Sequence, residues 1–257
     1  MAENPVIKKF GSAAAPSATE LQTMYDQPAY TGPRAGTRYM TLDDVVQRTG
    51  AMLLVLVLAG AAAWELVPLH SFQAALVVGL IGSLGLGLYM SFTMKANAAL
   101  CLAYSAFEGV ALGSISKAFE SVYPGIVIEA VTGTVMVALG MLFVYKIGAI
   151  RVTPKFTRVL VGAMFGVLGL MLVNGIAYLF TPDGLGIRGN GPAAVIFSLI
   201  CIAIAAMNLV WDFDVIERGI RNGADEKFAW YASFGLMVTL VWLYLEILRL
   251  LGNLRNN

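Results

Sequence analysis

Seven long apolar runs dominate the chain, and each is long enough to cross a lipid bilayer as a helix. A hydrocarbon core about 30 Å thick needs about 20 apolar residues at a rise of about 1.5 Å per residue. Polar residues, Pro or Gly interrupt the sequence between the runs. We therefore predict an all-α membrane protein, a bundle of seven transmembrane helices. The approximate cores of these helices are 46–67, 72–92, 97–118, 126–146, 158–180, 192–214 and 229–251.

Residues 1–40 lack this pattern and mix Pro, Gly, Ala, Ser and charged residues without the period of a helix or a strand. We expect a disordered cytoplasmic arm here, followed by a transmembrane domain over residues 41–257. Thr41 and Asp44 fit a capping box, in which each side chain can bind an otherwise unpaired backbone N–H. This motif predicts that the first helix begins there.

Small and aromatic residues suggest how the helices pack. Glycines at helical spacing let two helix backbones approach closely in a membrane, and we predict packing surfaces on the second and fifth helices. Their glycines are Gly79, Gly82, Gly85 and Gly87, and Gly162, Gly166 and Gly169. Aromatic rings near the ends of the runs are typical of the membrane interface. We predict such a belt from Trp64, Tyr104, Tyr178, Trp230, Trp242 and Tyr244.

Lys and Arg fall mostly on one side of the predicted membrane. With the N-terminus in the cytoplasm, four of the 17 lie outside, namely Lys117, Arg188, Arg249 and Arg255, and the other thirteen lie inside. The positive-inside rule therefore predicts a multi-pass protein of the plasma membrane with the N-terminus in the cytoplasm and the C-terminus outside. This orientation is opposite to that of a G-protein-coupled receptor. No Lys lies between Phe228 and Asn257 to bind retinal.

The overall composition narrows the functional classes. Hydrophobic residues make up 58% of the chain and charged residues 13%, against about 25% charged in soluble proteins. A net charge of +1 gives no general attraction to nucleic acid. Cys101 and Cys201 lie in apolar runs and are expected to be free thiols. Since His70 is the only histidine, we expect no zinc site, no Ser-His-Asp triad, no cofactor and no enzymatic activity.

Carboxylates inside a membrane are costly and usually face a bundle interior or a water path. Three occur in the predicted helices, at Glu108, Asp212 and Glu246. Asp214 is about 200° of helical rotation from Asp212, so the two cannot face the same way. Asp214 can pair with Arg218 one turn later, and Glu217 can pair likewise with Arg221.

Asp212 shares its helix face with Asn208, which gives a polar stripe directed into the membrane. We predict that Asp212 and Asn208 form a gate or proton-sensing site. The alternative is that Asp212 is an interface residue that reaches water.

Glu108 and Glu246 are candidates for an ion path together with Thr239, which shares a face with Glu246. Glu108 has no basic neighbour on its own helix, so it is either a proton or cation site or the partner in a structural hydrogen bond between helices. Glu246 is three residues from Arg249, which could simply neutralise it.

Three segments resemble the actinobacterial branch of the Bax inhibitor (transmembrane Bax-inhibitor-motif) family. They are RVTPKFTRVLVGA, VWDFDVIERGI and WYASFGLMVTLVWLYLEILRLLG, and the resemblance extends over about residues 40–252. It implies seven helices with the last one central. It also implies a pH-sensitive calcium leak channel, in which aspartates on helices six and seven form a proton-responsive latch.

The chain matches this family pattern only in part. Trp211 and Asp212 match the aromatic residue and aspartate of helix six, whereas Thr239 stands at the aspartate position of helix seven. The basic latch partner near the end of helix two has Lys95 as its nearest candidate, and Arg249 is the basic residue near Glu246. A two-carboxylate sensor is therefore either absent or rebuilt.

Two functions from different classes remain. The first is a cation leak channel, for calcium or protons, that is gated by Asp212. The second is a non-conducting regulator that binds a membrane protease or another membrane protein, an activity also found among family relatives, with residues 1–40 as the binding segment. An intramembrane aspartyl protease would need a second aspartate in a Gly-x-Gly-Asp setting, which the sequence lacks.

Overall fold

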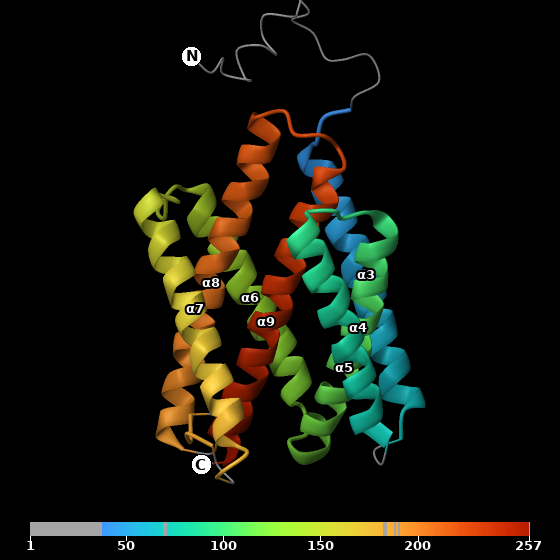
Figure 1. Cartoon of the computed structure of the whole chain (residues 1–257), viewed down its shortest axis with the longest axis vertical. Coiled ribbons are helices and arrows are strands. Elements are labelled where there is room, and N and C mark those ends of the chain that lie inside the picture. The colour runs from blue at the N-terminus through green and yellow to red at the C-terminus, as the bar shows by residue number, and fades with distance from the viewer. Residues whose placement is uncertain (1–37, 69–70, 182–183, 188, 190, 257) are drawn as a thin grey trace, which may run out of the picture. The chain divides into compact units, whose positions relative to one another are not determined.

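A computed structural model describes residues 38–68, 71–181, 184–187, 189 and 191–256, so His70, Arg188 and most of the predicted arm lie outside the described residues. Seven helices in this part of the chain are long and apolar enough to cross a membrane, which confirms the predicted fold class (Figure 1). They are α3 (Leu42–Leu66), α4 (Phe72–Thr93), α5 (Ala98–Val122), α6 (Ile126–Lys146), α7 (Pro154–Ala177), α8 (Pro192–Arg221) and α9 (Phe228–Asn256).

Local capping signals set the helix starts. The predicted capping box is present at α3, where Thr41 and Asp44 satisfy each other's backbone N–H. Asn97 accepts a hydrogen bond from the N–H of Leu100 and so begins α5, while Met94 takes a left-handed conformation at the end of α4. The predicted break between the second and third helices is therefore present.

Several helices extend further than the apolar runs. α7 begins at Pro154 rather than near residue 158, because Thr153 caps it and Pro is favoured in the first helical turn. α8 continues to Arg221 and α9 to Asn256, beyond the predicted ends of the runs at 214 and 251. A run marks the part of a helix that lies in hydrocarbon, and polar residues can carry the helix beyond it.

The bundle has its interior at α5, α8 and α9. These helices are about half buried over their most apolar stretch, whereas the other four are about one-fifth buried or less. α9 runs through the middle of the bundle, where it packs against α3, α5, α6 and α8 (Figure 1). α4 packs mainly on α5, and α7 packs on α8.

Glycines bring α3 and α5 into direct backbone contact. A Cβ added at Gly113 would lie 2.3 Å from the carbonyl oxygen of Gly60, and one at Gly109 would lie 2.4 Å from that of Leu56. The Lys117 ammonium then donates hydrogen bonds to the carbonyl oxygens of Trp64 and Val67 at the end of α3. These contacts hold the second half of α3 against α5.

The predicted glycine surfaces are correct for α4 only in part and wrong for α7. A Cβ at Gly79 would lie 2.7 Å from the backbone nitrogen of Ala111, and one at Gly82 would strike the Phe107 ring. In contrast, a Cβ at Gly162, Gly166 or Gly169 of α7 would meet nothing within 4 Å. These three glycines therefore make no close helix–helix contact in the described chain.

The predicted aromatic belt is also partly wrong. Tyr104 is 6% exposed and packs edge-on against Phe234 at a centroid distance of 5.0 Å. The Tyr244 hydroxyl forms a 2.6 Å hydrogen bond with Ser116. Tyr178, at the end of α7, is 45% exposed. Some of these rings therefore fill gaps between helices, since position along a run does not say which face of the helix is buried.

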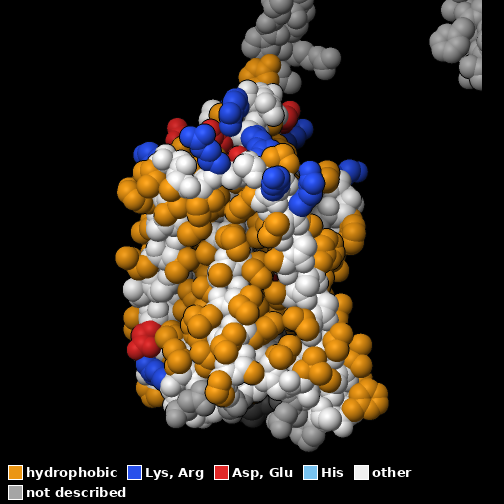
Figure 2. Space-filling view, turned by 90° about the vertical axis from the view of Figure 1, so that its left-hand side faces the viewer, with side chains coloured by type: hydrophobic (Ala, Val, Ile, Leu, Met, Phe, Trp, Pro, Cys, Tyr) orange, Lys and Arg blue, Asp and Glu red, His pale blue; other side chains and the backbone are white. Residues whose placement is uncertain are grey.

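One end of the bundle carries most of the positive charge (Figure 2). It contains the starts of α3, α5, α7 and α9. Of the thirteen Lys and Arg in the described residues, three lie toward the opposite end, namely Lys117, Arg249 and Arg255. The other ten lie at this basic end: Arg38, Arg48, Lys95, Lys146, Arg151, Lys155, Arg158, Arg218, Arg221 and Lys227. Between the two ends the visible surface is predominantly hydrophobic.

Candidate functional site

A chain of hydrogen bonds joins α8 to α9 in the interior of the bundle. The Asn208 Nδ2 donates to Thr239 Oγ1 at 2.6 Å, and Thr239 Oγ1 donates to Asp212 Oδ2 at 2.6 Å. Asn208 and Thr239 are 6% and 1% exposed. Asp212 is thus anchored to the central helix by a buried hydroxyl, and the two predicted site residues of α8 lie together.

The helical period explains this arrangement. Asn208 and Asp212 are four residues apart and therefore share a face of α8. On α9, Gly235 lies one turn before Thr239, and a Cβ there would be 3.7 Å from Asp212 Oδ1. This is an ordinary van der Waals distance, so position 235 lies directly beside the carboxyl group. The carbonyl oxygen of Gly235 lies 3.2 Å from Thr239 Oγ1 and gives that hydroxyl a second possible acceptor.

A cavity of about 620 Å³ brings Asp212 together with Glu108. Residues of α4, α5, α8 and α9 line it, including Asn208, Thr239 and Ser83. Glu108 is 8% exposed, and it lines the cavity together with Ser83 of α4. Two carboxyl groups that are far apart in sequence therefore line one cavity, which is large enough to hold many water molecules.

Sequence reasoning did not identify three further residues of this cavity. Ser83 lies among the glycines of α4, which were interpreted only as packing positions. Tyr104 was assigned to the membrane interface, and Gly235 belongs to no recognised motif. All three line the cavity. For Ser83, a polar residue near the middle of an apolar run was the available signal.

The remaining predicted site residues lie elsewhere. Glu246 is 1% exposed and pairs with Arg249 at 2.8 Å. It does not line the cavity that holds Asp212. Lys95 follows the end of α4, is exposed, and pairs with no carboxylate in the described residues.

The predicted pairs on the outer stripe of α8 are confirmed. Arg218 forms an ion pair with Asp214, and Arg221 pairs with Glu217 at 3.2 Å. This separates Asp214, which is paired with an arginine, from Asp212, which is bound by Thr239. The two aspartates therefore have different partners, although they are only two positions apart in the sequence.

The chemistry available at the cavity is that of carboxyl, amide and hydroxyl groups. Glu108 and Asp212 can bind protons or attract a cation. No group of three or more His, Cys, Asp or Glu residues in the described parts of the chain could hold a metal ion.

The sequence matches the family model described as Bax inhibitor 1 like over residues 4–256. No curated protein matches the chain closely enough to count as a relative. The family match covers almost the whole chain and includes every helix that lines the cavity.

Proposed function

Because the chain belongs to the Bax inhibitor 1 like family, we propose that it is a cation leak channel of the cell membrane, with calcium as the candidate ion. Asp212 is the gate carboxylate. The observation that carries this proposal is the buried contact of Asp212 with Thr239, at a cavity that Glu108 also lines. The alternative of a non-conducting regulator depends on a segment that lies almost entirely outside the described residues.

The gate works through a difference in proton affinity between two arrangements of α8 and α9. In the closed arrangement Asp212 accepts the hydrogen bond from Thr239. An open arrangement that separates these two groups gives Asp212 another environment, so it binds protons with another affinity. Proton concentration then shifts the populations of the two arrangements.

Glu108 takes the place of the missing carboxylate on the last helix. Thr239 stands where the family pattern has an aspartate, and the second carboxyl group comes from α5 instead. Two carboxylates that face one cavity attract a positive ion more strongly than either does alone. Glu108 therefore lines the ion path, and Asp212 combines the functions of ion contact and gate.

The test is cation flux into liposomes that contain the purified protein, measured over a pH series for wild type and Asp212→Asn. The amide cannot be ionised, so the variant should lose the pH dependence. If the two arrangements differ tenfold in proton affinity, wild-type flux changes by up to about tenfold between the ends of the series. Calcium and a monovalent cation are measured separately.

Asp43→Asn is the matched control, because Asp43 is an exposed aspartate at the basic end of the bundle. It should keep the wild-type pH profile. Glu108→Gln should lower the flux at pH values where Glu108 is ionised, since it then removes one negative charge from the path. Equal pH profiles for wild type and Asp212→Asn would contradict the proposal that Asp212 is the gate. Flux no greater than in empty liposomes would contradict the proposal that the protein is a channel.

A further inference from the structure

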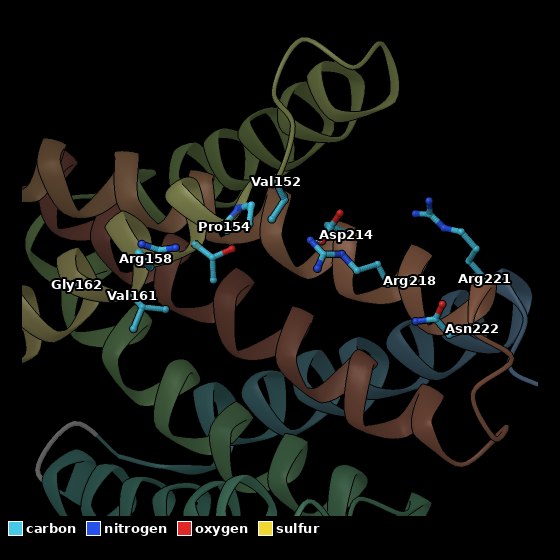
Figure 3. Close-up of a pocket in the computed structure, with 10 residues that line it drawn as sticks. Val152, Pro154, Arg158, Val161, Gly162, Asp214, Arg218, Arg221 and Asn222 are labelled. Atoms are coloured by element: carbon cyan, nitrogen blue, oxygen red, sulfur yellow. Dashed lines mark ion pairs between the residues drawn. The ribbon is translucent and has the colours of Figure 1, made fainter.

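A second and larger cavity opens at the basic end of the bundle, between the first turns of α7 and the last turns of α8. Its volume is about 1040 Å³. Figure 3 shows Pro154, Arg158 and Val161 of α7 on one side and Arg218 and other α8 residues on the other. Asp214 rather than Asp212 lines it, so it is separate from the proposed gate.

The lining of this cavity is positive. Three arginines, Arg158, Arg218 and Arg221, and one carboxylate, Asp214, contribute to it. Asp214 is already paired with Arg218, and Arg221 forms an exposed pair with Glu217. Arg158 pairs with no carboxylate in the parts of the chain that the structure describes. Since exposed ion pairs contribute little, Arg221 can exchange its partner for a ligand at small cost.

The start of α7 adds to this positive field. Thr153 caps the helix and Pro154 occupies its first turn, so this end of a 24-residue helix faces the cavity with the positive end of its dipole. Guanidinium groups bind phosphate oxygens with two parallel hydrogen bonds. The positive groups of this cavity therefore favour the binding of an oxyanion. They are Arg158, the two arginines of α8 and the start of α7.

The position in the membrane favours the same chemistry. Ten of the thirteen described Lys and Arg lie at this end, which the positive-inside rule assigns to the cytoplasmic face, where anionic lipids give the surface a negative potential. Basic pockets between transmembrane helices on this face are typical sites for anionic headgroups. Val152, Val161 and Gly162 give the cavity an apolar side that would suit the lipid chains.

We propose that this cavity binds a phosphate group, carried either by the headgroup of an anionic membrane lipid or by a free phosphate ion. Arg158 makes the central contact, and Arg218 and Arg221 close the site from α8. The proposal does not depend on whether the protein conducts ions.

The test uses the full chain in nonionic detergent, with dioleoylphosphatidylglycerol, dioleoylphosphatidylcholine and inorganic phosphate as probes. Native mass spectrometry measures the retained lipid, and the thermal unfolding midpoint gives an apparent affinity for each probe. Arg158→Gln should weaken phosphatidylglycerol binding by about tenfold, the effect of losing one charge-assisted contact. Phosphatidylcholine should bind weakly to all forms.

Arg151→Gln is the control, because Arg151 is exposed just before α7 and does not line the cavity. It should bind like wild type. Should Arg158→Gln fold poorly, Arg221→Gln, whose side chain is 64% exposed, measures the same site with little risk to folding. If the cavity variants lose binding of phosphatidylglycerol and inorganic phosphate has no effect, the ligand is a lipid headgroup. If inorganic phosphate displaces phosphatidylglycerol from the wild type, the site also binds the free ion. Equal binding by wild type and both cavity variants would overturn the proposal.

Discussion

At the scale of single residues, Thr239 decides how Asp212 is held. A hydroxyl has one hydrogen to donate and two lone pairs to accept with. Thr239 accepts from Asn208, and both Asp212 Oδ2 at 2.6 Å and the Gly235 carbonyl at 3.2 Å lie within reach of its hydrogen. In our proposal this hydrogen points to Asp212 when the carboxylate is ionised and to Gly235 when it is protonated. An aspartate at position 239 could not make this exchange.

Thr239→Val should therefore destabilise the protein and flatten its pH response. Valine has the shape of threonine without the hydroxyl, so Asn208 and Asp212 lose their common partner. Hydrogen bonds between helices in membranes contribute about 0.6 kcal/mol on average and up to about 1.7 kcal/mol, and two are lost here. We expect a loss of about 1 kcal/mol in the free energy of unfolding, measured by denaturant titration in mixed micelles. Thr239→Ser keeps the hydroxyl and should stay close to wild type, whereas equal values for the two variants would show that the hydroxyl contributes nothing.

At the scale of helices, ends that carry a local capping signal could be predicted from the sequence, whereas the contacting faces could not. Thr41 with Asp44, and the break at Asn97, act on backbone groups within four residues, so local sequence reveals them. The choice between Gly113 and Gly166 as a contact depends on which helix lies opposite, and that is a property of the whole bundle. Hydrophobic periodicity gave little help, because residues that face lipid and residues that face other helices are both apolar.

Gly113→Ala tests the contact between α3 and α5. The added methyl group would lie 2.3 Å from the backbone oxygen of Gly60, so the helices must separate. Overpacking of this kind costs about 1–3 kcal/mol, and the thermal unfolding midpoint in detergent should fall. Gly166→Ala is the control, because nothing lies within 4 Å of that position and alanine favours a helix by up to about 1 kcal/mol. It should leave the midpoint unchanged or raise it, and a fall as large as that of Gly113→Ala would contradict the role of the contact.

At the scale of the whole molecule, the sequence predicts the number and order of the helices but not the shared cavity. Asp212 and Asn208 could be paired from their spacing on one helix. Glu108 and Asp212 meet only because α5 and α8 both adjoin the same cavity, and no local pattern records that. The separation of Glu246 from Asp212 follows equally from tertiary packing. The difference in positive charge between the two ends of the bundle, in contrast, can be predicted by counting Lys and Arg in the segments between the helices.

The predicted orientation can be tested with single cysteines. Cys101 and Cys201 are fully buried, so they should contribute little background. Arg151 lies exposed at the basic end, and Ser121 lies exposed near the end of α5 at the opposite side. In intact cells a membrane-impermeant maleimide should label Ser121→Cys but label Arg151→Cys only after permeabilisation. The reverse pattern would place the basic end outside and overturn the orientation.

The seating of α3 on α5 has a mechanical consequence. The backbone contact at Gly113 and the hydrogen bonds from Lys117 to the end of α3 join these two helices into one block. α4 packs against this block. Across the cavity, α8 is fastened to α9 instead. The cavity therefore separates α4 from α8, while α3 and α5 remain joined to α9 through contacts such as the hydrogen bond between Ser116 and Tyr244. A slight tilt of the block would widen or narrow this gap, and the contacts of α3 and α5 with α9 would have to adjust to it.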